Sequence, residues 1–161
     1  IDVRNYGIDG NNHSGVLDSI INIVSQKPGF IVAQWPNPLR MTLWNHGTKE
    51  LHNINSTNQI FQLLLKDGEE NFYAPWTQSI IAANTICRLN NTPIVNIVLE
   101  ANLDSRFVSI IESYEIKLHI DEKISGKSWI FDSAGSDGLH HSANAHRAWA
   151  NRIIGLINEV T

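Results

Sequence analysis

The chain has 161 residues, 42% of them hydrophobic and 17% charged, and a formal net charge of −4. This length and composition predict one globular domain over residues 1–161 with enough apolar surface for a core. The acidic balance and the lack of a Lys/Arg cluster argue against a nucleic-acid partner, because phosphate binding needs a basic face. No apolar run approaches the roughly 20 residues that span a bilayer, so we expect no membrane span.

The single cysteine, Cys87, excludes an internal disulfide and lies in an apolar helical pattern, which favours a buried structural thiol over a nucleophile. The chain opens on Ile1 without a signal peptide, and we interpret this start as that of a processed or incompletely represented chain. Secretion or association with a virion is therefore still open, and we predict no cofactor and no resident metal.

Short apolar runs alternate with longer periodic segments, the pattern of α/β units around a parallel sheet. Ser14 is expected to cap the first helix, and Pro28-Gly29 to end it. The strands are expected at 3–6, 30–33, 94–99, 116–120 and 129–131, and the helices between Ser14 and Pro28 and at 58–66, 77–89, 105–114 and 143–159.

Between residues 41 and 76 the periodicity weakens and the chain becomes polar and aromatic. Excursions of this length in a compact domain are usually lids or binding loops, so we predict a lid or insertion here. Trp35, Arg40, Trp44 and Trp76 are candidates to line a substrate pocket, although aromatic residues at such spacing also pack subdomains.

An acid and a histidine lie three residues apart in Ser136-Asp137-Gly138-Leu139-His140, just before the closing helix. In a hydrolase such a pair works as general base and orienter: His140 takes a proton from a hydroxyl nucleophile, and Asp137 fixes its tautomer. The glycine permits the reversal that brings the two side chains within hydrogen-bonding reach. The alternative is a helix start, with Ser142 as N-cap and the preceding polar residues solvated.

This C-terminal stretch resembles the last block of the SGNH (GDSL-like) hydrolases, in which Asp-x-x-His precedes the closing helix. Asn5-Tyr6-Gly7-Ile8-Asp9-Gly10-Asn11 looks like the second block, which implies that the backbone N–H of Gly10 serves the oxyanion hole. Trp35-Pro36-Asn37-Pro38 falls where the third block, Gly-x-Asn-Asp, is expected, which implies Asn37 as the oxyanion asparagine. Here Trp35 replaces the glycine of the block and Pro38 its aspartate.

The resemblance implies a flavodoxin-like three-layer α/β/α sandwich with a mainly parallel sheet in the order 2-1-3-4-5. It also implies a serine esterase acting on an acyl or acetyl ester of a small molecule or glycan. The first block, with its Gly-Asp-Ser nucleophile, is absent from these residues, and the first strand is absent with it. Ser14 and Ser136 do not lie on a strand-to-helix elbow and are poor substitutes.

That missing strand would lie between the strands at 3–6 and 30–33, and buried unpaired backbone groups cost about 1–3 kcal/mol each. We therefore expect an N-terminal segment or a second chain to complete the sheet and carry the serine. The alternative is a rearranged order in which the two strands pair directly.

Two further classes are open. A metal-dependent hydrolase would use Asp132, Asp137, His140, His141 and His146, but adjacent histidines point apart, and His141 and His146 do not have the i, i+4 spacing of helical zinc pairs. A non-catalytic SGNH-like binding or virion structural module would keep the Asp-His pair without activity. Two sequence patterns loosely resemble those of SGNH-like proteins encoded by phages and other viruses. They are Trp-x-x-x-x-Arg from Trp35 to Arg40 and the His-, Trp- and Ala-containing run from His141 to Ala150.

Overall fold

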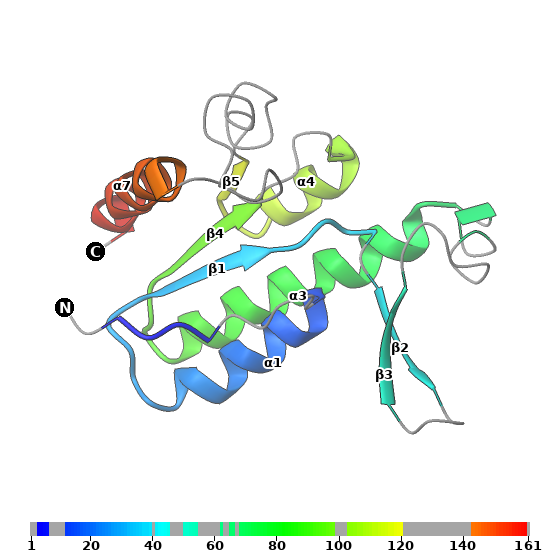
Figure 1. The fold of residues 1–161 in the computed structure, drawn as a ribbon, viewed down its shortest axis with the longest axis horizontal. Coiled ribbons are helices and arrows are strands. Elements are labelled where there is room, and N and C mark those ends of the chain that lie inside the picture. The colour runs from blue at the N-terminus through cyan, green and yellow to red at the C-terminus, as the bar shows by residue number, and fades with distance from the viewer. Residues whose placement is uncertain are drawn as a thin grey trace.

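The computed structural model describes residues 3–6, 12–39, 41–45, 50–54, 62, 65–66, 68–98, 103–120 and 143–160 (Figure 1). Helices and strands alternate along most of this chain, as the sequence predicts for an α/β protein. The elements are α1 (His13–Val24), β1 (Ile31–Trp35), β2 (Met41–Asn45), β3 (Glu50–Ile54), α3 (Glu70–Leu89), β4 (Ile94–Val98), α4 (Ser105–Glu112), β5 (Leu118–Ile120) and α7 (Ala143–Val160).

The main sheet has three parallel strands in the order β1-β4-β5. Ile31 pairs with Ile94 in the first ladder, and Asn96 pairs with Leu118 in the second. Each ladder joins strands separated in sequence by a helix, α3 between β1 and β4 and α4 between β4 and β5. This is the crossover connection that parallel strands require. The α/β class with a parallel sheet is thereby confirmed.

The core lies between this sheet and helices α1 and α3. Alternate side chains of β1, namely Ile31, Ala33 and Trp35, are buried, and α3 covers them with a stripe of buried residues. The further members of this core cluster are Ile20, Trp76, Ile80, Ala83, Cys87, Val98, Ile111 and Ile116. Cys87 is buried, as the sequence predicts, and this burial raises the pKa of its thiol to about 11, which disfavours the nucleophilic thiolate.

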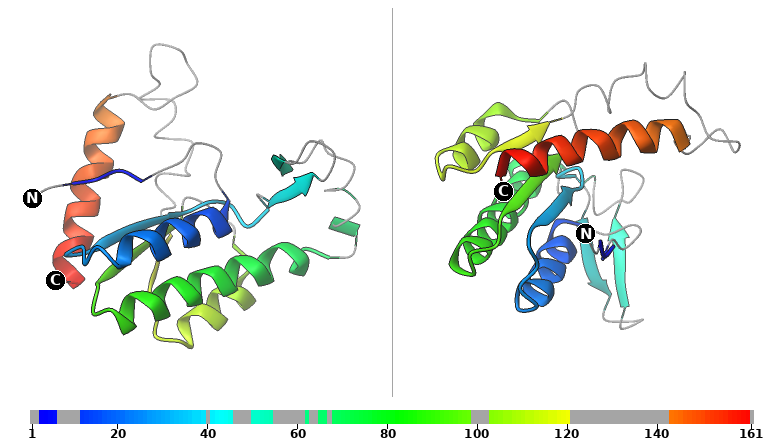
Figure 2. Two further views of the ribbon diagram at one scale, coloured as in Figure 1. Left: turned by 90° about the horizontal axis from the view of Figure 1, so that it is seen from below. Right: turned by 90° about the vertical axis from the view of Figure 1, so that its left-hand side faces the viewer.

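Helix α7 lies on the face of β4 opposite to α3 (Figure 2). Asn96 of β4 hydrogen-bonds Asn84 on α3, whereas the neighbouring Ile97 lines a small cavity with Trp149 of α7. Because successive strand residues point to opposite faces, the two helices contact opposite faces of the strand. The described residues thus form an open α/β sheet with one helix on the second face, which is less than a complete three-layer sandwich.

Helix α1 begins where the sequence predicts, but with another cap. The side-chain Oδ1 of Asn12 accepts hydrogen bonds from the backbone N–H of Gly15 and the hydroxyl of Ser14, each at 3.0 Å. Asn12 is therefore the N-cap, and the expectation for Ser14 is wrong because its hydroxyl serves the cap as a donor. The helix ends before Pro28, as predicted.

The strand predicted at Val3–Tyr6 is not formed. These residues belong to neither sheet of the described chain, and Val3 and Tyr6 are 79% and 41% exposed. The segment runs on the side of β1 away from β4 (Figures 1 and 2), and the Tyr6 hydroxyl donates to Oε1 of Gln26 at 3.3 Å. With polar Arg4 and Asn5 between the apolar residues, little is gained by burying it. Among the described strands, β1 is thus an edge strand.

The expected lid region contains a hairpin that the sequence analysis missed. Strands β2 and β3 pair antiparallel, with Met41 opposite Ile54, and extend beyond the end of β1 (Figure 1). Helix α3 begins at Glu70, seven residues before the predicted start, and it includes Pro75. The helix expected at 58–66 lies mostly outside the described residues, as does the strand expected at 129–131.

Candidate active site at the carboxyl edge of the sheet

The carboxyl ends of β1 and β4 meet at one edge of the sheet. Helices α3 and α4 each run back to the amino end of the next strand, so their first turns lie at this edge too (Figure 1). In open parallel sheets this edge is where ligands bind. It is also where the sequence analysis places its candidate residues.

Asn37 is at this edge, in the turn that follows β1. Its side chain is exposed, and its Oδ1 accepts a hydrogen bond from the backbone N–H of Leu39 at 2.7 Å. This is an Asx-type turn, in which the side-chain amide is anchored through its oxygen. The amide nitrogen, which an oxyanion hole would use as its donor, is consequently turned away from the N–H of Leu39.

Trp35 and Trp76 are fully buried. The indole N–H of Trp35 donates to Oδ1 of Asn96 at 3.0 Å, and that of Trp76 donates to the carbonyl of Pro36 at 2.9 Å. Both indoles therefore pack in the core, which is the alternative that the sequence leaves open for aromatic residues at this spacing. Trp44 lies in β2 opposite Leu51.

Four predicted site residues, namely Gly10, Arg40, Asp137 and His140, lie outside the described residues. The element that follows the Asp-His pair is formed as predicted, since α7 begins at Ala143, three residues after His140. Of the metal-ligand candidates, only His146 falls on a described element. No group of three metal-ligating side chains occurs in the part of the chain that the structure describes.

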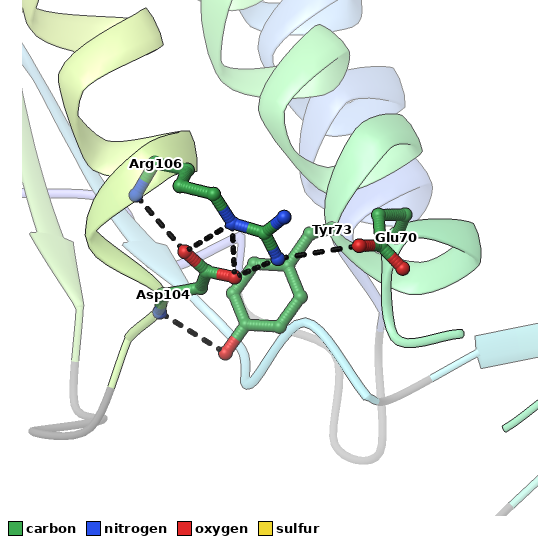
Figure 3. Close-up of polar contacts among 4 residues, drawn as sticks. All are labelled: Glu70, Tyr73, Asp104 and Arg106. Atoms are coloured by element: carbon green, nitrogen blue, oxygen red, sulfur yellow. Dashed lines mark hydrogen bonds and ion pairs between the residues drawn. The ribbon is translucent and has the colours of Figure 1, made fainter.

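A polar cluster that the sequence analysis missed links the starts of α3 and α4 (Figure 3). Asp104 caps α4 by accepting from the backbone N–H of Arg106 at 2.9 Å, and its carboxylate also binds the Arg106 guanidinium at 2.6 Å. Arg106 reaches Glu70 on α3 at 3.2 Å, and the Tyr73 hydroxyl accepts from the backbone N–H of Asp104 at 3.4 Å. The signal for it was an Asp directly before a predicted helix.

The electrostatics of this cluster are those of a surface ion pair. The hydrogen bond from Arg106 lowers the pKa of Asp104, and the same contact raises the pKa of Arg106. The Arg106 and Glu70 side chains are 65% and 55% exposed, so water screens their attraction. The Tyr73 ring stacks on Phe107 at 5.0 Å between centroids. The cluster therefore links α4 to α3, and its one guanidinium is shared between two carboxylates.

A buried histidine and serine also lie in contact, between α1 and α3. Nδ1 of His13 is 3.0 Å from the Ser79 hydroxyl, which itself donates to the carbonyl of Pro75 at 2.9 Å. Because a serine hydroxyl has one proton, the imidazole is the donor in the first contact. Burial lowers the pKa of His13. Both side chains are shut off from solvent, so this pair joins two helices and offers no nucleophile to a substrate.

Comparison with known proteins finds no matching family model, no curated relative and no solved structure of significant similarity. Among the described helices, none has the length and apolarity needed to cross a membrane.

Proposed function

We propose that this chain is the larger part of an SGNH-type serine ester hydrolase, acting on an acyl or acetyl ester of a small molecule or glycan. The observation that carries the proposal is the Asp137-Gly138-Leu139-His140 motif, which directly precedes helix α7 in the sequence. The main sheet of the same chain is all-parallel. Asn37, at the carboxyl end of β1, supports the proposal from an independent segment of the chain. The proposal includes a serine supplied by polypeptide outside residues 1–161.

The sheet supports this reading of the fold. Strands β1, β4 and β5 lie side by side in chain order, which is the order of the last three strands in a 2-1-3-4-5 sheet. Helix α7 supplies part of a second helical layer. The whole domain is then a flavodoxin-like three-layer α/β/α sandwich, in which one more strand pairs with the open edge of β1.

The open edge of β1 has a defined set of backbone groups. The backbone N–H of Ile31 donates to the carbonyl of Pro93. The backbone N–H and C=O groups of Ile31, Ala33 and Trp35 therefore point toward β4, and those of Val32 and Gln34 point toward the open edge. Edge strands of parallel sheets are usually short, charged or covered. Here β1 has three buried side chains and no charged residue, so nothing in its sequence protects this edge by charge.

In the proposed reaction the serine hydroxyl attacks the ester carbonyl while His140 takes its proton. Asp137 stabilises the imidazolium, and the N–H of Gly10 and the amide of Asn37 hold the oxyanion. The alkoxide leaves with the proton from His140. Water then attacks the acyl-enzyme by the same route, which releases the acid and restores the serine.

The test is active-site labelling of the product of the full reading frame that encodes these residues, by a fluorophosphonate probe. We expect one labelled serine and hydrolysis of p-nitrophenyl acetate. His140→Ala should lower kcat by a factor of about 10³ or more, because removal of a triad member typically has an effect of this size. His141→Ala, the adjacent imidazole, is the matched control and should keep activity. Both variants should retain the wild-type circular dichroism spectrum.

The second candidate is a non-catalytic SGNH-like module, and the observation that favours it is the lack of any Gly-Asp-Ser in these 161 residues. A folded full-length protein that is neither labelled nor active, with or without added Zn²⁺, would support that candidate. Activity that EDTA abolishes and Zn²⁺ restores would instead support the metal-dependent hydrolase.

A further inference from the structure

The turn after β1 presents an exposed polar side chain, Asn37, on a backbone that buried residues anchor. Asn37 is exposed, whereas the next residue, Pro38, is among the most fully buried residues of the described chain. Proline fixes its own φ near −65° and restricts the residue before it to extended conformations. Pro36 and Pro38 thus restrict the backbone dihedral angles of all four residues from Trp35 to Pro38.

Two buried indoles anchor this turn, one by a hydrogen bond to the turn itself and one at the end of the strand that precedes it. Trp76 of α3 donates to the carbonyl of Pro36 at 2.9 Å, one residue before Asn37. Trp35, at the end of β1, donates to Oδ1 of Asn96 at 3.0 Å. Both side chains are fully buried, so these hydrogen bonds are made away from competing water.

Asn96 is itself fixed by a reciprocal amide pair. Its Nδ2 donates to Oδ1 of Asn84 at 2.9 Å, and Nδ2 of Asn84 donates back to Oδ1 of Asn96 at 3.2 Å. Nδ2 of Asn84 also reaches the carbonyl of Ile80 at 2.8 Å. A satisfied polar network inside an apolar core specifies one arrangement of its members more strictly than apolar packing does.

From this geometry we infer that Trp76, Trp35 and Asn96 are positioning residues for Asn37, because they fix the turn from which its side-chain amide would act as an oxyanion donor. The inference rests on the proposed function for its chemical purpose. Oxyanion donors act through preorganisation, since a donor that must first be ordered stabilises the transition state less. The exposed amide and its buried support are the arrangement that such a donor requires.

Trp76→Phe tests the inference by removing the indole N–H while keeping an aromatic ring. Because Leu39 N–H closes the turn on Asn37, we expect its amide hydrogen exchange to accelerate about 5- to 10-fold, the factor that one neutral hydrogen bond provides. Exchange at Ala33, in the middle of β1, should stay within twofold. Trp149→Phe on α7 is the control, and it should leave Leu39 unchanged.

The kinetic readout separates positioning from substrate binding. In the full-length protein, Trp76→Phe should lower kcat about 5- to 10-fold with KM within twofold, whereas Asn37→Ala should lower kcat about 10²- to 10³-fold. If the wild-type protein has no esterase activity, the proposed function fails, while the exchange of Leu39 still tests the positioning role. Unchanged Leu39 exchange in a folded Trp76→Phe protein would overturn the inference.

A measurement on the wild-type chain covers the case in which Trp76→Phe does not fold. The ¹⁵N-indole resonances of Trp35 and Trp76 should show N–H exchange at least 10-fold slower than that of a free indole. Exchange of the Trp76 indole at the free rate would mean that the hydrogen bond to Pro36 is not formed, and the inference would then be wrong.

Discussion

His13 at the start of α1 and Ser79 in the middle of α3 are 66 residues apart in sequence, yet Nδ1 of one lies 3.0 Å from the hydroxyl of the other. The imidazole is 7% exposed, and its pKa is lowered from 6.5 by burial. The contact lies between the two helices that cover the same side of the sheet. The protonation state of His13 is consequently coupled to the packing of α1 on α3.

This coupling predicts a stability that falls in mild acid. Since the folded pKa lies below the unfolded value, the unfolded chain binds more protons between the two, and stability rises with pH through that range. The contribution is fully present above pH 6.5, the unfolded value, and is lost as pH falls toward the folded pKa. Urea denaturation of wild type and His13→Asn at pH 7.5 and pH 5 measures it.

His13→Asn keeps a hydrogen-bonding atom near the position of Nδ1 but does not titrate. We expect the denaturation midpoint to fall less between pH 7.5 and pH 5 in the variant than in wild type. His119, whose pKa is also lowered, first by burial and then by Lys117, is present in both proteins and cancels in the comparison. Equal falls in the two proteins would assign the acid sensitivity elsewhere.

Thr77 carries a buried hydroxyl that has no hydrogen-bond partner, and it is the only such side-chain atom found among the described residues. An unsatisfied buried polar group costs about 1–3 kcal/mol, so replacing the hydroxyl by a methyl group should be favourable. We expect Thr77→Val to raise the free energy of unfolding by about 1 kcal/mol, measured by urea denaturation.

Thr85 offers a matched control on the same helix. Its hydroxyl donates to the carbonyl of Ile81 at 2.8 Å, so Thr85→Val removes a satisfied group and should bring no comparable gain. A loss of stability in Thr77→Val would show that a water molecule or a ligand satisfies the Thr77 hydroxyl in solution.

Much of the fold follows from local signals in the sequence. Strand β4 and helix α7 match the predicted ranges closely. The apolar run after Pro93 indicates a buried strand, and the long amphipathic period of the C-terminal segment indicates a helix. The 41–54 hairpin was missed because it lacks clear alternation and a two-residue turn of the Asn-Gly type. Val3–Tyr6 was predicted as a strand from a short run in which Arg4 and Asn5 interrupt the apolar residues, a weak signal for burial.

The candidate site was harder to predict than the fold. Asn37 was predicted from the resemblance of Trp35 to Pro38 to the third SGNH block, and the structure leaves it exposed after β1. Its support from Trp76 and the pairing of Asn84 with Asn96 depend on contacts between α3 and strands far away in sequence. Nothing in the local pattern distinguishes a tryptophan that donates to a turn from one that lines a pocket.

The cluster at the starts of α3 and α4 predicts an order of stability effects. Asp104→Ala removes both the α4 cap and a partner of Arg106, whereas Asp104→Asn keeps the cap acceptor. Arg106→Ala leaves the cap in place and removes surface contacts of an exposed guanidinium. The fall in melting temperature should be largest for Asp104→Ala and smallest for Arg106→Ala. An equal effect of Asp104→Asn and Asp104→Ala would mean that the charge, and not the cap, is the stabilising feature.

The outer edge of β1 gives the most direct test of the sheet. In the chain of residues 1–161 the amides of Ala33 and Trp35 face β4, whereas those of Val32 and Gln34 face the open edge. Amide hydrogen exchange should therefore alternate along β1, slow at 33 and 35 and fast at 32 and 34. In the product of the full reading frame, the proposed additional strand should pair with that edge and slow the exchange at all four positions.

The two measurements separate the alternatives for this edge. Alternation in both proteins would mean that no strand joins β1, which would favour the non-catalytic module, because no segment would then bring a serine to this edge. Slow exchange at all four positions in residues 1–161 alone would mean that the edge is already paired within this chain. The expected change, from alternating to uniformly slow exchange, would show that the sheet is completed from outside these residues.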